Sequence, residues 1–370
     1  MKKICFVTAA RSEYGLLKWL MHDISASERF QLQLVVTGGH LLAEQGRTLD
    51  AILKDGFKID ETIDVRLDVT SQATIAASMG RMGEGFAAAF ERLRPDYLLV
   101  LGDRYELLPI CSTAFVMMIP IIHLSGGDVT EGAIDDGIRN AVTMLASYHF
   151  PATEDSARNV IRMRGSDKNV WAVGDPGLDA FNRETPLTRE ALAQDLGLDP
   201  SARWALMTYH AETRQSLDHN LAAAENCIRA LKALEGWQVV MTYANADFGG
   251  RALNDLLVRA AEEEPGRFRA VPSLGHLRYL SFMRQAGLVA GNSSSGISEA
   301  PLARVPVVNI GDRQKGRYQC GNVVQCDPSF DAIAGAMDAA LRKKIADDDL
   351  GYWGDGHTSE RIVKILSERL

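Results

Sequence analysis

The chain has 370 residues, which exceeds the length over which a single hydrophobic core usually grows, so we expect two domains of ordinary size. Hydrophobic residues make up 46% of the chain and charged residues 24%, which is typical of a globular protein and excludes a largely disordered one. The formal net charge of -8 argues against a protein that binds nucleic acid or anionic membranes broadly, because both need clustered basic surface.

The cysteines and histidines show no metal-binding or disulfide pattern. Five cysteines are scattered without a CxxC pair, and the eight histidines show no HxxxH spacing. This usage predicts a reducing, cytoplasmic compartment and no metal or other cofactor. The most apolar stretch, 107–124, is interrupted by Pro109, Pro120 and His123, so we expect no membrane span.

Short apolar runs alternate with segments of helical periodicity along the whole chain, which predicts parallel sheets built from βαβ units. In the first half, strands are expected at 3–9, 31–38, 96–102, 119–124 and 148–152. Helices are expected at 13–26, 41–54, 72–94, 105–118 and 135–146. Residues 1–175 are therefore predicted to form one doubly wound α/β domain.

A second α/β domain is predicted for 176–356. It opens with a region at 176–204 that contains three prolines and a short capped helix and that is expected to act as a hinge. Strands are then expected at 204–210, 237–243, 268–272, 287–292, 305–311 and 322–326, and helices at 215–234, 249–264, 276–286, 295–303, 330–344 and 356–370. Because ligands bind at the carboxyl ends of such strands, the two Rossmann-like domains are predicted to face a cleft that holds the active site.

The segment GNSSSGISEAP, 291–301, is the strongest candidate for an anion site. Ser293, Ser294 and Ser295 stand at an expected helix start, where backbone N–H groups and the positive helix end favour a phosphate. The alternative is an ordinary serine-rich N-cap. Glu299, one turn later, is a candidate to accept hydrogen bonds from ribose hydroxyls, or else a solvated helix charge.

Two further loops are basic. The segment NIGDRQKGR, 309–317, brings Arg313, Lys315 and Arg317 to the end of a predicted strand, where they suit a diphosphate, although a solvated loop is the alternative. In TAARSEYG, 8–15, Arg11 stands where the first strand meets its helix. This loop lacks GxGxxG, so a dinucleotide-binding turn is not supported.

Acidic residues follow two other predicted strands. Asp103, Arg104 and Glu106 end the strand in VLGDRYE, either for catalysis or with an aspartate–arginine pair as a structural ion pair. The segment 121–141 carries a Gly-Gly turn followed by Asp135 and Asp136, which either take part in chemistry or balance the helix dipole.

Three histidines complete the set of candidates from the residues alone. His123 at a strand end is either a core or a catalytic residue, and His40 lies in TGGHLL. His210 ends the first strand of the second domain, near Glu212 and Arg214, and is a candidate to stabilise phosphate charge.

Taken together, RSEYG, GDRYE, HLSGGDVTEGAIDDGIR, GNSSSGISEAP and VNIGDRQKGR resemble the hydrolysing UDP-N-acetylglucosamine 2-epimerases of sialic-acid and related nonulosonic-acid biosynthesis. The resemblance spans most of the chain. It implies the B-type glycosyltransferase architecture, with a C-terminal helix, here 357–370, that returns to the first domain. It also implies a UDP-sugar substrate, and we expect a homo-oligomer, either a dimer or a tetramer.

The resemblance also implies roles for single residues. Those that would hold the nucleotide are Arg11, Arg104, His210, Asn245, Ser293, Ser294, Glu299 and Arg313, with Glu299 at the ribose. Asp103 and Asp135 would act as acid/base groups on the sugar, helped by His40 and His123. Removal of the weakly acidic C2 hydrogen needs a positioned base and a stabilised leaving diphosphate. The product of this elimination is a 2-acetamidoglycal, which then takes up water at C1 and a proton at C2.

The sequence departs from the family pattern at three positions. Ser125 stands where members usually carry glutamate or histidine, Asp128 replaces a glutamate, and Asn140 replaces a frequent histidine. These changes point to a modified sugar such as a 6-deoxy-2,4-diacetamido hexose. A non-hydrolysing epimerase, a retaining glycosyltransferase on the same architecture and a nucleotide-sugar-binding protein without turnover remain as alternatives.

Overall fold

The computed structural model describes residues 1–42, 48–343, 345 and 349–370. These residues form two compact units, which are described separately. Unit 1 comprises Met1–Val129, Ile134–Asn182 and Trp353–Leu370, and unit 2 comprises Thr130–Ala133 and Arg183–Tyr352.

Unit 1 is built on a six-stranded parallel sheet in the order β3-β2-β1-β4-β5-β6. The strands are β1 (Lys2–Thr8), β2 (Phe30–Thr37), β3 (Glu61–Ile63), β4 (Tyr97–Leu101), β5 (Ile121–Leu124) and β6 (Tyr148–Phe150). The order reverses between β1 and β4, and the carboxyl ends of strands at such a reversal are where open α/β sheets bind ligands. The short edge strand β3 was not predicted.

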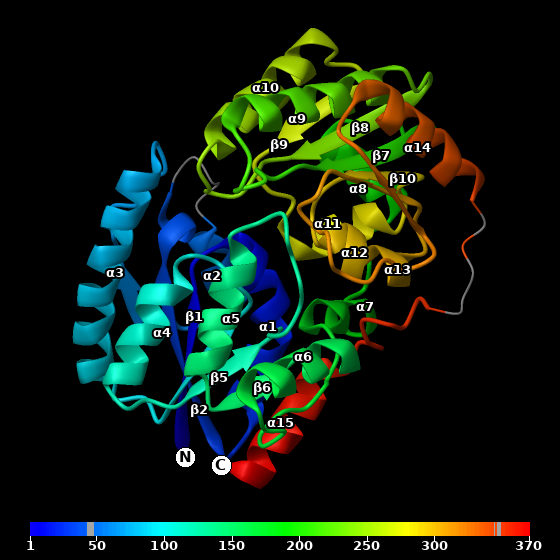
Figure 1. Ribbon diagram of the computed structural model, residues 1–370. Coiled ribbons are helices and arrows are strands. Elements are labelled where there is room, and N and C mark those ends of the chain that lie inside the picture. Colours follow the sequence, from blue (N-terminus) through cyan, green and yellow to red (C-terminus); the bar gives the residue numbers. More distant parts are fainter. Residues whose placement is uncertain (43–47, 344, 346–348) are drawn as a thin grey trace. The chain divides into compact units, whose positions relative to one another are not determined.

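Side chains of β1 alternate between two buried faces of this sheet. Cys5 and Val7 pack with the helices α3 (Gln72–Leu93), α4 (Leu107–Val116) and α5 (Asp135–Leu145), whereas Ile4 and Phe6 pack with α1 (Arg11–Ala26) and α15 (Thr358–Arg369). Figure 1 shows α3, α4 and α5 along one face of the unit 1 sheet. A central parallel strand that is covered on both sides reads as a continuous apolar run, which is why β1 was readily predicted.

The other helices of unit 1 are short. They are η1 (Gly38–Leu41), α2 (Leu49–Lys54), α6 (Glu154–Arg164), η3 (Pro176–Leu178) and α7 (Asp179–Arg183). Within the predicted helix 41–54, the structure describes α2, and residues 43–47 lie outside the described residues. Helix α6 was not predicted.

Unit 2 repeats the same topology with the sheet order β12-β11-β10-β7-β8-β9. Its strands are β7 (Arg203–Thr208), β8 (Trp237–Thr242), β9 (Phe268–Val271), β10 (Leu288–Gly291), β11 (Val307–Ile310) and β12 (Val323–Cys326). All neighbouring strands pair in parallel. The order reverses between β7 and β10, so two doubly wound parallel sheets confirm the predicted α/β fold class. The prediction that they face a cleft stays a prediction.

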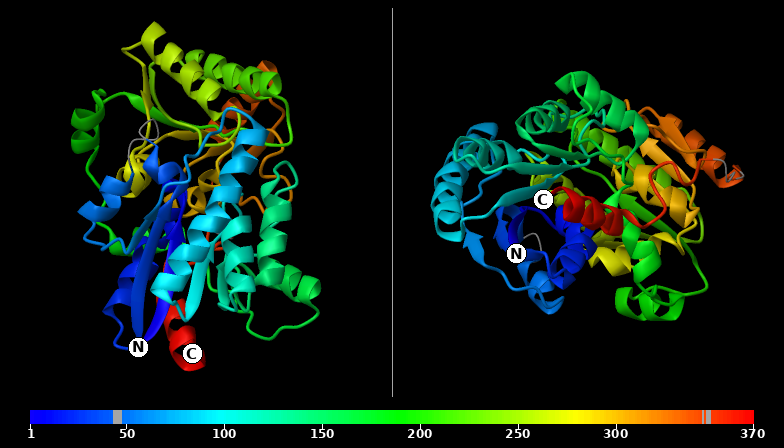
Figure 2. Two further views of the ribbon diagram at one scale, coloured as in Figure 1. Left: turned by 90° about the vertical axis from the view of Figure 1, so that its left-hand side faces the viewer. Right: turned by 90° about the horizontal axis from the view of Figure 1, so that it is seen from below.

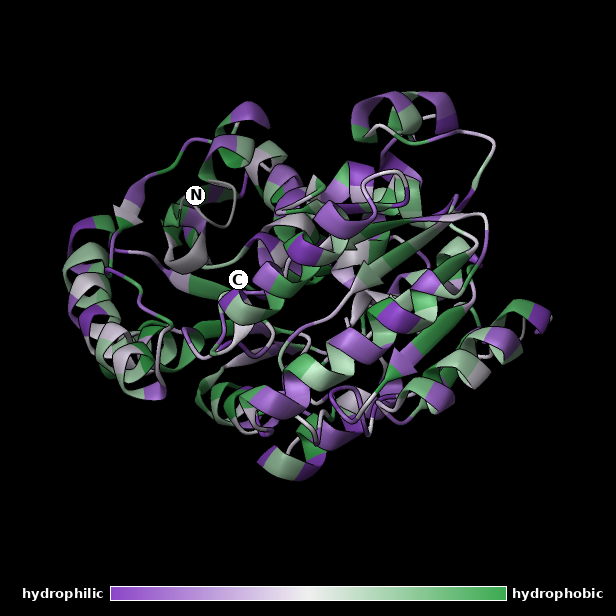
Figure 3. Cartoon of the chain, turned by 90° about the horizontal axis from the view of Figure 1, so that it is seen from above, coloured by the Kyte–Doolittle hydropathy of each residue, from purple (hydrophilic) through white to green (hydrophobic). Residues whose placement is uncertain are grey.

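Seven helices are described in unit 2 beyond the part shared with α7: α8 (Arg189–Leu196), α9 (Leu217–Lys232), α10 (Gly250–Glu263), α11 (Gly275–Met283), α12 (Ser295–Ser298), α13 (Ala300–Ala303) and α14 (Phe330–Arg342). Ala205 and Met207 of β7 share a core with α9, α10 and α14. Figure 3 shows strands that are mostly hydrophobic and helices in which hydrophilic and hydrophobic residues alternate. The predicted helix 330–344 ends at Arg342, and residue 344 lies outside the described residues.

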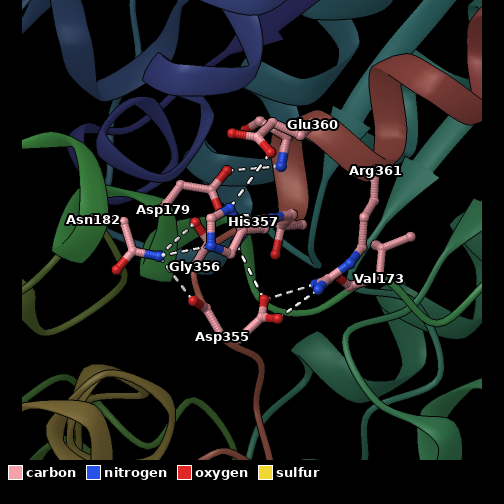
Figure 4. A network of polar contacts seen from close by, with 10 residues as sticks. Val173, Asp179, Asn182, Asp355, Gly356, His357, Glu360 and Arg361 are labelled. Atoms are coloured by element: carbon pink, nitrogen blue, oxygen red, sulfur yellow. Dashed lines mark hydrogen bonds and ion pairs between the residues drawn. The ribbon is translucent and has the colours of Figure 1, made fainter.

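The end of the chain returns to unit 1, where a buried carboxylate fixes it. Asp179 accepts hydrogen bonds from the backbone N–H groups of Thr358 and Ser359, each at 2.7 Å, and so satisfies the first turn of α15. Figure 4 shows this contact beside the exposed ion pair between Asp355 and Arg361. Unit 1 therefore extends to Asn182, whereas the sequence placed the first domain boundary after residue 175.

Both termini lie at the same end of unit 1 (Figure 2), where Met1 and Leu370 line one shallow hollow. Among the described residues, no helix is both long and apolar enough to cross a bilayer.

Candidate active site

The predicted acid/base residues of unit 1 follow the carboxyl ends of β4 and β5. Asp103 comes directly after the Gly102 turn that ends β4, and Asp135 opens α5. Gly102 has a φ of 80°, in the left-handed region that favours glycine. Both acids are half-buried, so each keeps some access to solvent.

A fully buried guanidinium links these acids. Arg139 in α5 donates hydrogen bonds to the Asp103 carboxylate and, at 2.9 Å, to the carbonyl oxygen of Asp128. Its Nη1 also lies 3.5 Å from Oδ1 of Asp136. Burial opposes the charged form of Arg139, but the negative charges of Asp103, Asp128 and Asp135 outweigh it and raise the pKa of Arg139. The result is an acidic cluster held in place by one cation.

His123 has both ring nitrogens engaged. Nε2 lies 2.8 Å from the carbonyl oxygen of Gly102 and therefore donates to it, and Nδ1 lies 3.2 Å from Oγ1 of Thr143, from which it accepts. Burial lowers the pKa of His123 to about 4, so the ring is neutral. This geometry favours a role in positioning the Gly102–Asp103 turn over direct proton transfer.

His40 is similarly enclosed. Its Nε2 lies 2.8 Å from Oγ1 of Thr8, and its Nδ1 lies 2.7 Å from Oγ1 of Thr48. Burial lowers the pKa of His40 to about 4. The two hydroxyl partners tie the end of β1 to the start of α2, and no described contact supports the predicted helper role in catalysis.

The turn after β5 is tightly built. Ser125 has a φ of 58°, and its N–H donates to the carbonyl oxygen of Phe150 at 2.9 Å. A Cβ on Gly127 would lie 2.1 Å from the carbonyl oxygen of Ser156, so only glycine fits there. Asp128 accepts a hydrogen bond from the Ser156 hydroxyl at 2.6 Å. Asp128 is thus anchored to α6, and Ser125 supplies no group of comparable basicity.

The predicted nucleotide residues of unit 1 follow β1 and β4. Arg11 is the first residue of α1 and is half-buried. Arg104 is buried and forms a bidentate pair with Glu106, with Nε–Oε2 and Nη2–Oε1 distances of 3.1 and 2.9 Å. Arg104 is therefore in a structural ion pair with Glu106, whereas the sequence suggested an aspartate as its partner.

Glu13 is a buried residue of this region that the sequence analysis did not single out. Its Oε2 accepts hydrogen bonds from the N–H groups of Ala9 at 2.7 Å and Ala10 at 3.0 Å, and so shapes the loop before Arg11. Burial, reinforced by the charge of Glu106, raises the pKa of Glu13 to about 7.

In unit 2, His210 is fixed by an asparagine on the neighbouring strand end. The N–H of His210 donates to the side chain of Asn292 at 2.8 Å, and the Asn292 amide donates back to the His210 carbonyl oxygen at 2.9 Å. The ring Nδ1 accepts from the N–H of Asn245 at 3.1 Å, so in the neutral ring Nε2 carries the proton. His210 is therefore oriented to donate from Nε2.

The serine segment follows β10, but its helix is shorter than predicted. In place of one helix at 295–303, α12 and α13 meet at Glu299, and Pro301 lies in the first turn of α13. A Cβ on Gly291 would lie 2.0 Å from the carbonyl oxygen of Thr208, so glycine is required where β10 ends. The hydroxyls of Ser293 and Ser295 lie 3.0 Å apart, and Ser294 is the N-cap residue of α12.

Of the three cations after β11, Arg313 contacts the serine segment. Its Nη1 donates to the carbonyl oxygen of Asn292 at 3.0 Å. Lys315 lies 3.7 Å from the carboxylate of Glu131, and Arg317 donates to Gln314 at 3.1 Å. The three cations are therefore oriented by different neighbours and do not act as one cluster.

Glu299 is buried beside a histidine that sequence reasoning missed. Oε1 of Glu299 lies 3.5 Å from Nε2 of His276 in α11. The Tyr279 hydroxyl, one turn further along α11, lies 2.6 Å from Oγ of Ser295. Helix α11 thus contacts the serine segment at two points.

Several of these residues carried little signal in the sequence. Arg139 and Asn292 lie inside quoted motifs, but a polar residue in a helix or after a strand is usually solvated, so only the fold reveals their burial. Among the described residues, no group of three or more His, Cys, Asp or Glu side chains is arranged to hold a metal ion.

Comparisons with known proteins place this geometry in a family. The profile of the UDP-N-acetylglucosamine 2-epimerase family matches residues 22–367. The GDP/UDP-N,N'-diacetylbacillosamine 2-epimerase (hydrolyzing) of Campylobacter jejuni is 34% identical over 326 residues, which cover 88% of this chain and 84% of that protein. The UDP-N,N'-diacetylbacillosamine 2-epimerase (hydrolyzing) of Legionella pneumophila is 34% identical over 367 residues, which cover 99% of this chain and 96% of that protein.

Solved structures share the fold. The UDP-GlcNAc 2-epimerase of Neisseria meningitidis, bound to UDP-GlcNAc, matches with a TM-score of 0.82 at 17% identity and covers 99% of this chain and 100% of that chain. The UDP-GlcNAc 2-epimerase of Methanocaldococcus jannaschii matches with a TM-score of 0.82 at 16% identity and covers 99% of both chains. With a family match over nearly its whole length, this chain belongs to the UDP-N-acetylglucosamine 2-epimerase family.

Proposed function

We propose that the chain is a hydrolysing nucleotide-sugar 2-epimerase, which converts a nucleotide-linked 2-acetamido sugar and water into the free 2-epimer and a nucleoside diphosphate. The relatives from Campylobacter jejuni and Legionella pneumophila, each 34% identical, support this assignment because both are named as hydrolysing 2-epimerases. The reaction proceeds by elimination of the nucleoside diphosphate to a 2-acetamidoglycal. Addition of water at C1 and of a proton at C2, on the face opposite to the one that lost its proton, completes it.

The sugar of this proposal is a 2,4-diacetamido-6-deoxy hexose. The names of both relatives support it, since N,N'-diacetylbacillosamine carries acetamido groups at C2 and C4 and no C6 hydroxyl. The serine at position 125 agrees with a sugar pocket that differs from that of enzymes acting on N-acetylglucosamine. The nucleotide is UDP, with GDP as the second possibility that the Campylobacter jejuni relative raises.

Asp103 and Asp135 are the acid/base pair of the proposal. The observation that carries it is the cluster around Arg139. The buried guanidinium of Arg139 donates a hydrogen bond to Asp103 and interacts electrostatically with the negative charge of Asp135. A carboxylate that accepts a hydrogen bond from a guanidinium is stabilised in its charged form, which suits a base. Two acid/base groups are needed, because one face of C2 loses a proton and the other gains one.

The residues proposed to hold the nucleotide are Arg11, Arg104, His210, Asn245, Ser293, Ser294, Glu299 and Arg313. The orientation of His210 by Asn292 and Asn245 supports this assignment, because it makes Nε2 the ring nitrogen that carries the proton, as a phosphate donor requires. A homo-oligomer, as a dimer or tetramer, and a cytoplasmic location also belong to the proposal. All five cysteines are free, which supports a reducing compartment.

The test follows the C2 proton in deuterated water. The protein is incubated separately with UDP-N-acetylglucosamine and with its 2,4-diacetamido-6-deoxy analogue, and products are followed by NMR. We expect free sugar of manno configuration with deuterium at C2, together with UDP, and faster turnover of the diacetamido donor. Return of an intact, epimerised nucleotide sugar would establish a non-hydrolysing enzyme instead.

Variants separate chemistry from binding. Asp103→Asn and Asp135→Asn are each expected to lower kcat at least ~100-fold while UDP affinity stays within about threefold, because only proton transfer is removed. The matched control is Asp155→Asn, at an exposed acid in the first turn of α6, which is expected to leave turnover unchanged. Equal losses in all three variants would contradict the assignment.

A further inference from the structure

Helix α11 contacts the serine segment through two side chains one turn apart. Tyr279 and His276 stand three positions apart on α11 and meet Ser295 and Glu299, which stand four positions apart. Residues at these spacings share one face of a helix. The N–H of Glu299 donates to the carbonyl oxygen of Ser295 at 3.1 Å, so a helical turn joins the two partners.

The Tyr279–Ser295 contact is a hydrogen bond, whereas the His276–Glu299 contact is too long to be one. The Tyr279 hydroxyl lies 2.6 Å from Ser295 and 3.3 Å from Oγ1 of Thr208, so it belongs to a closed chain of hydroxyls. By contrast, Nε2 of His276 and Oε1 of Glu299 are 3.5 Å apart, beyond the 2.7–3.2 Å that N–H···O hydrogen bonds typically span. His276 and Glu299 therefore do not form a hydrogen bond with each other.

The atoms at this open contact are buried without hydrogen bonds. Both ring nitrogens of His276 and Oε1 of Glu299 have no hydrogen-bond partner, and the side chains are only 13% and 7% exposed. Buried polar groups in native proteins are nearly always paired, because an unpaired one loses its hydration without compensation. Two such groups that face each other indicate a missing partner that both donates and accepts.

A hydroxyl group fits this requirement. It can donate to the Glu299 carboxylate and accept from an imidazole N–H, whereas a phosphate oxygen could not donate to Glu299. Two atoms 3.5 Å apart can both lie within hydrogen-bond distance of one oxygen placed beside them. Among the parts of a nucleoside diphosphate, the ribose supplies such hydroxyls.

We propose that His276 is a nucleotide-recognition residue that shares one ribose hydroxyl with Glu299. The inference rests on the proposed function, which places Glu299 at the ribose, and it adds a second contact from α11. His276 would then make the enzyme select ribonucleotides over deoxyribonucleotides, since loss of the hydroxyl leaves two buried groups unpaired.

The experiment measures binding without turnover. Isothermal titration calorimetry gives Kd for UDP, 2′-deoxy-UDP and 3′-deoxy-UDP, with the GDP counterparts in parallel because the ribose is common to both. We expect His276→Ala to weaken binding of the parent diphosphate about tenfold and to leave binding of one deoxy analogue within twofold. His276→Gln, whose side-chain N–H can reach a similar position, is expected to restore most of the affinity.

The matched control is Arg278→Ala on the same helix, which removes an exposed contact with Asp195 and is expected to leave every Kd unchanged. Equal weakening of the parent and both deoxy diphosphates by His276→Ala would show that His276 only holds α11 and would overturn the inference, as would no weakening at all. Wild-type protein that binds neither UDP nor GDP would overturn the proposed function as well, so the two failures are distinguishable.

Discussion

Arg139, fully buried in α5, donates a hydrogen bond to Asp103, which lies 36 positions earlier in the chain at the end of β4. The same guanidinium holds the Asp128 carbonyl oxygen, so one side chain connects the turn after β4 to the turn after β5. Position and protonation of Asp103 therefore depend on a residue that need not touch the sugar.

Arg139→Lys is expected to lower kcat about 100-fold with little change in KM or in the Kd of UDP. Lysine keeps the charge but lacks the fork that reaches both oxygens, and small displacements of a catalytic group have effects of this size. Steady-state kinetics and calorimetry check the split. Arg158→Lys, at an exposed arginine that pairs with Asp155, is the control. A fall in UDP affinity equal to the fall in kcat/KM would contradict this positioning role.

Ser125→Ala is expected to change turnover less than threefold. The Ser125 hydroxyl is too weak a base to replace the glutamate or histidine usual in the family, and its backbone is already held at a φ of 58°. Ser125→Gly, which suits the left-handed backbone, serves as the conformational control. If Ser125→Ala lowers turnover more than about 30-fold and Ser125→Gly does not restore full activity, the Ser125 hydroxyl has a direct role in catalysis.

The stability of unit 1 is expected to fall in mild acid. Burial lowers the pKa of His40 and His123 to about 4 and that of His149 to about 3, whereas an unfolded histidine titrates near 6.5. The neutral rings stabilise the fold fully above pH 6.5, and this contribution is lost as the pH falls toward 4, at up to about 1.4 kcal/mol per pH unit per histidine.

Chemical denaturation between pH 8 and pH 4 measures this loss. Glu13 acts in the opposite sense, since its raised pKa of about 7 contributes stability below pH 4.5 that is lost as the pH rises through 7, but it is one group against three. His149→Phe is expected to flatten the acid side of the profile. An unchanged slope in this variant would exclude His149 as a source.

Asp179→Asn is expected to destabilise unit 1 by about 2–3 kcal/mol, because the amide presents a donor to one of two buried N–H groups. Hydrogen exchange should then rise selectively in α15. The control lies in the same network (Figure 4): Asp355→Asn breaks an exposed ion pair with Arg361 and weakens an exposed hydrogen bond from the N–H of His357, and it is expected to cost less than about 1 kcal/mol. Equal effects from both variants would show that burial of Asp179 does not matter.

The strands were predictable because the central strands of both sheets are covered on both faces, which leaves uninterrupted apolar runs such as 98–101 and 288–290. Strand β3 and helix α6 escaped prediction for the opposite reason. Residues 61–63 read ETI and residues 154–164 read EDSARNVIRMR, so both are polar segments that owe their structure to the sheet or helices beside them.

The candidate site was predictable where it depends on strand ends, as for Asp103 and His210. It was not predictable where long-range burial decides. Nothing in the sequence distinguishes Arg139 from a solvated helix arginine, and His123 could equally have been core or catalytic until Gly102 and Thr143 were seen to occupy its ring.

Helix α15 also sets the order of events during synthesis. Ile362 and Leu366 belong to the same core as Ile4 and Phe6, so the core around β1 is completed by residues that are translated after unit 2. The whole of the intervening Arg183–Tyr352 stretch is translated before that core can close. On that side of its sheet, nascent unit 1 therefore has α1 but lacks α15 until unit 2 has been translated.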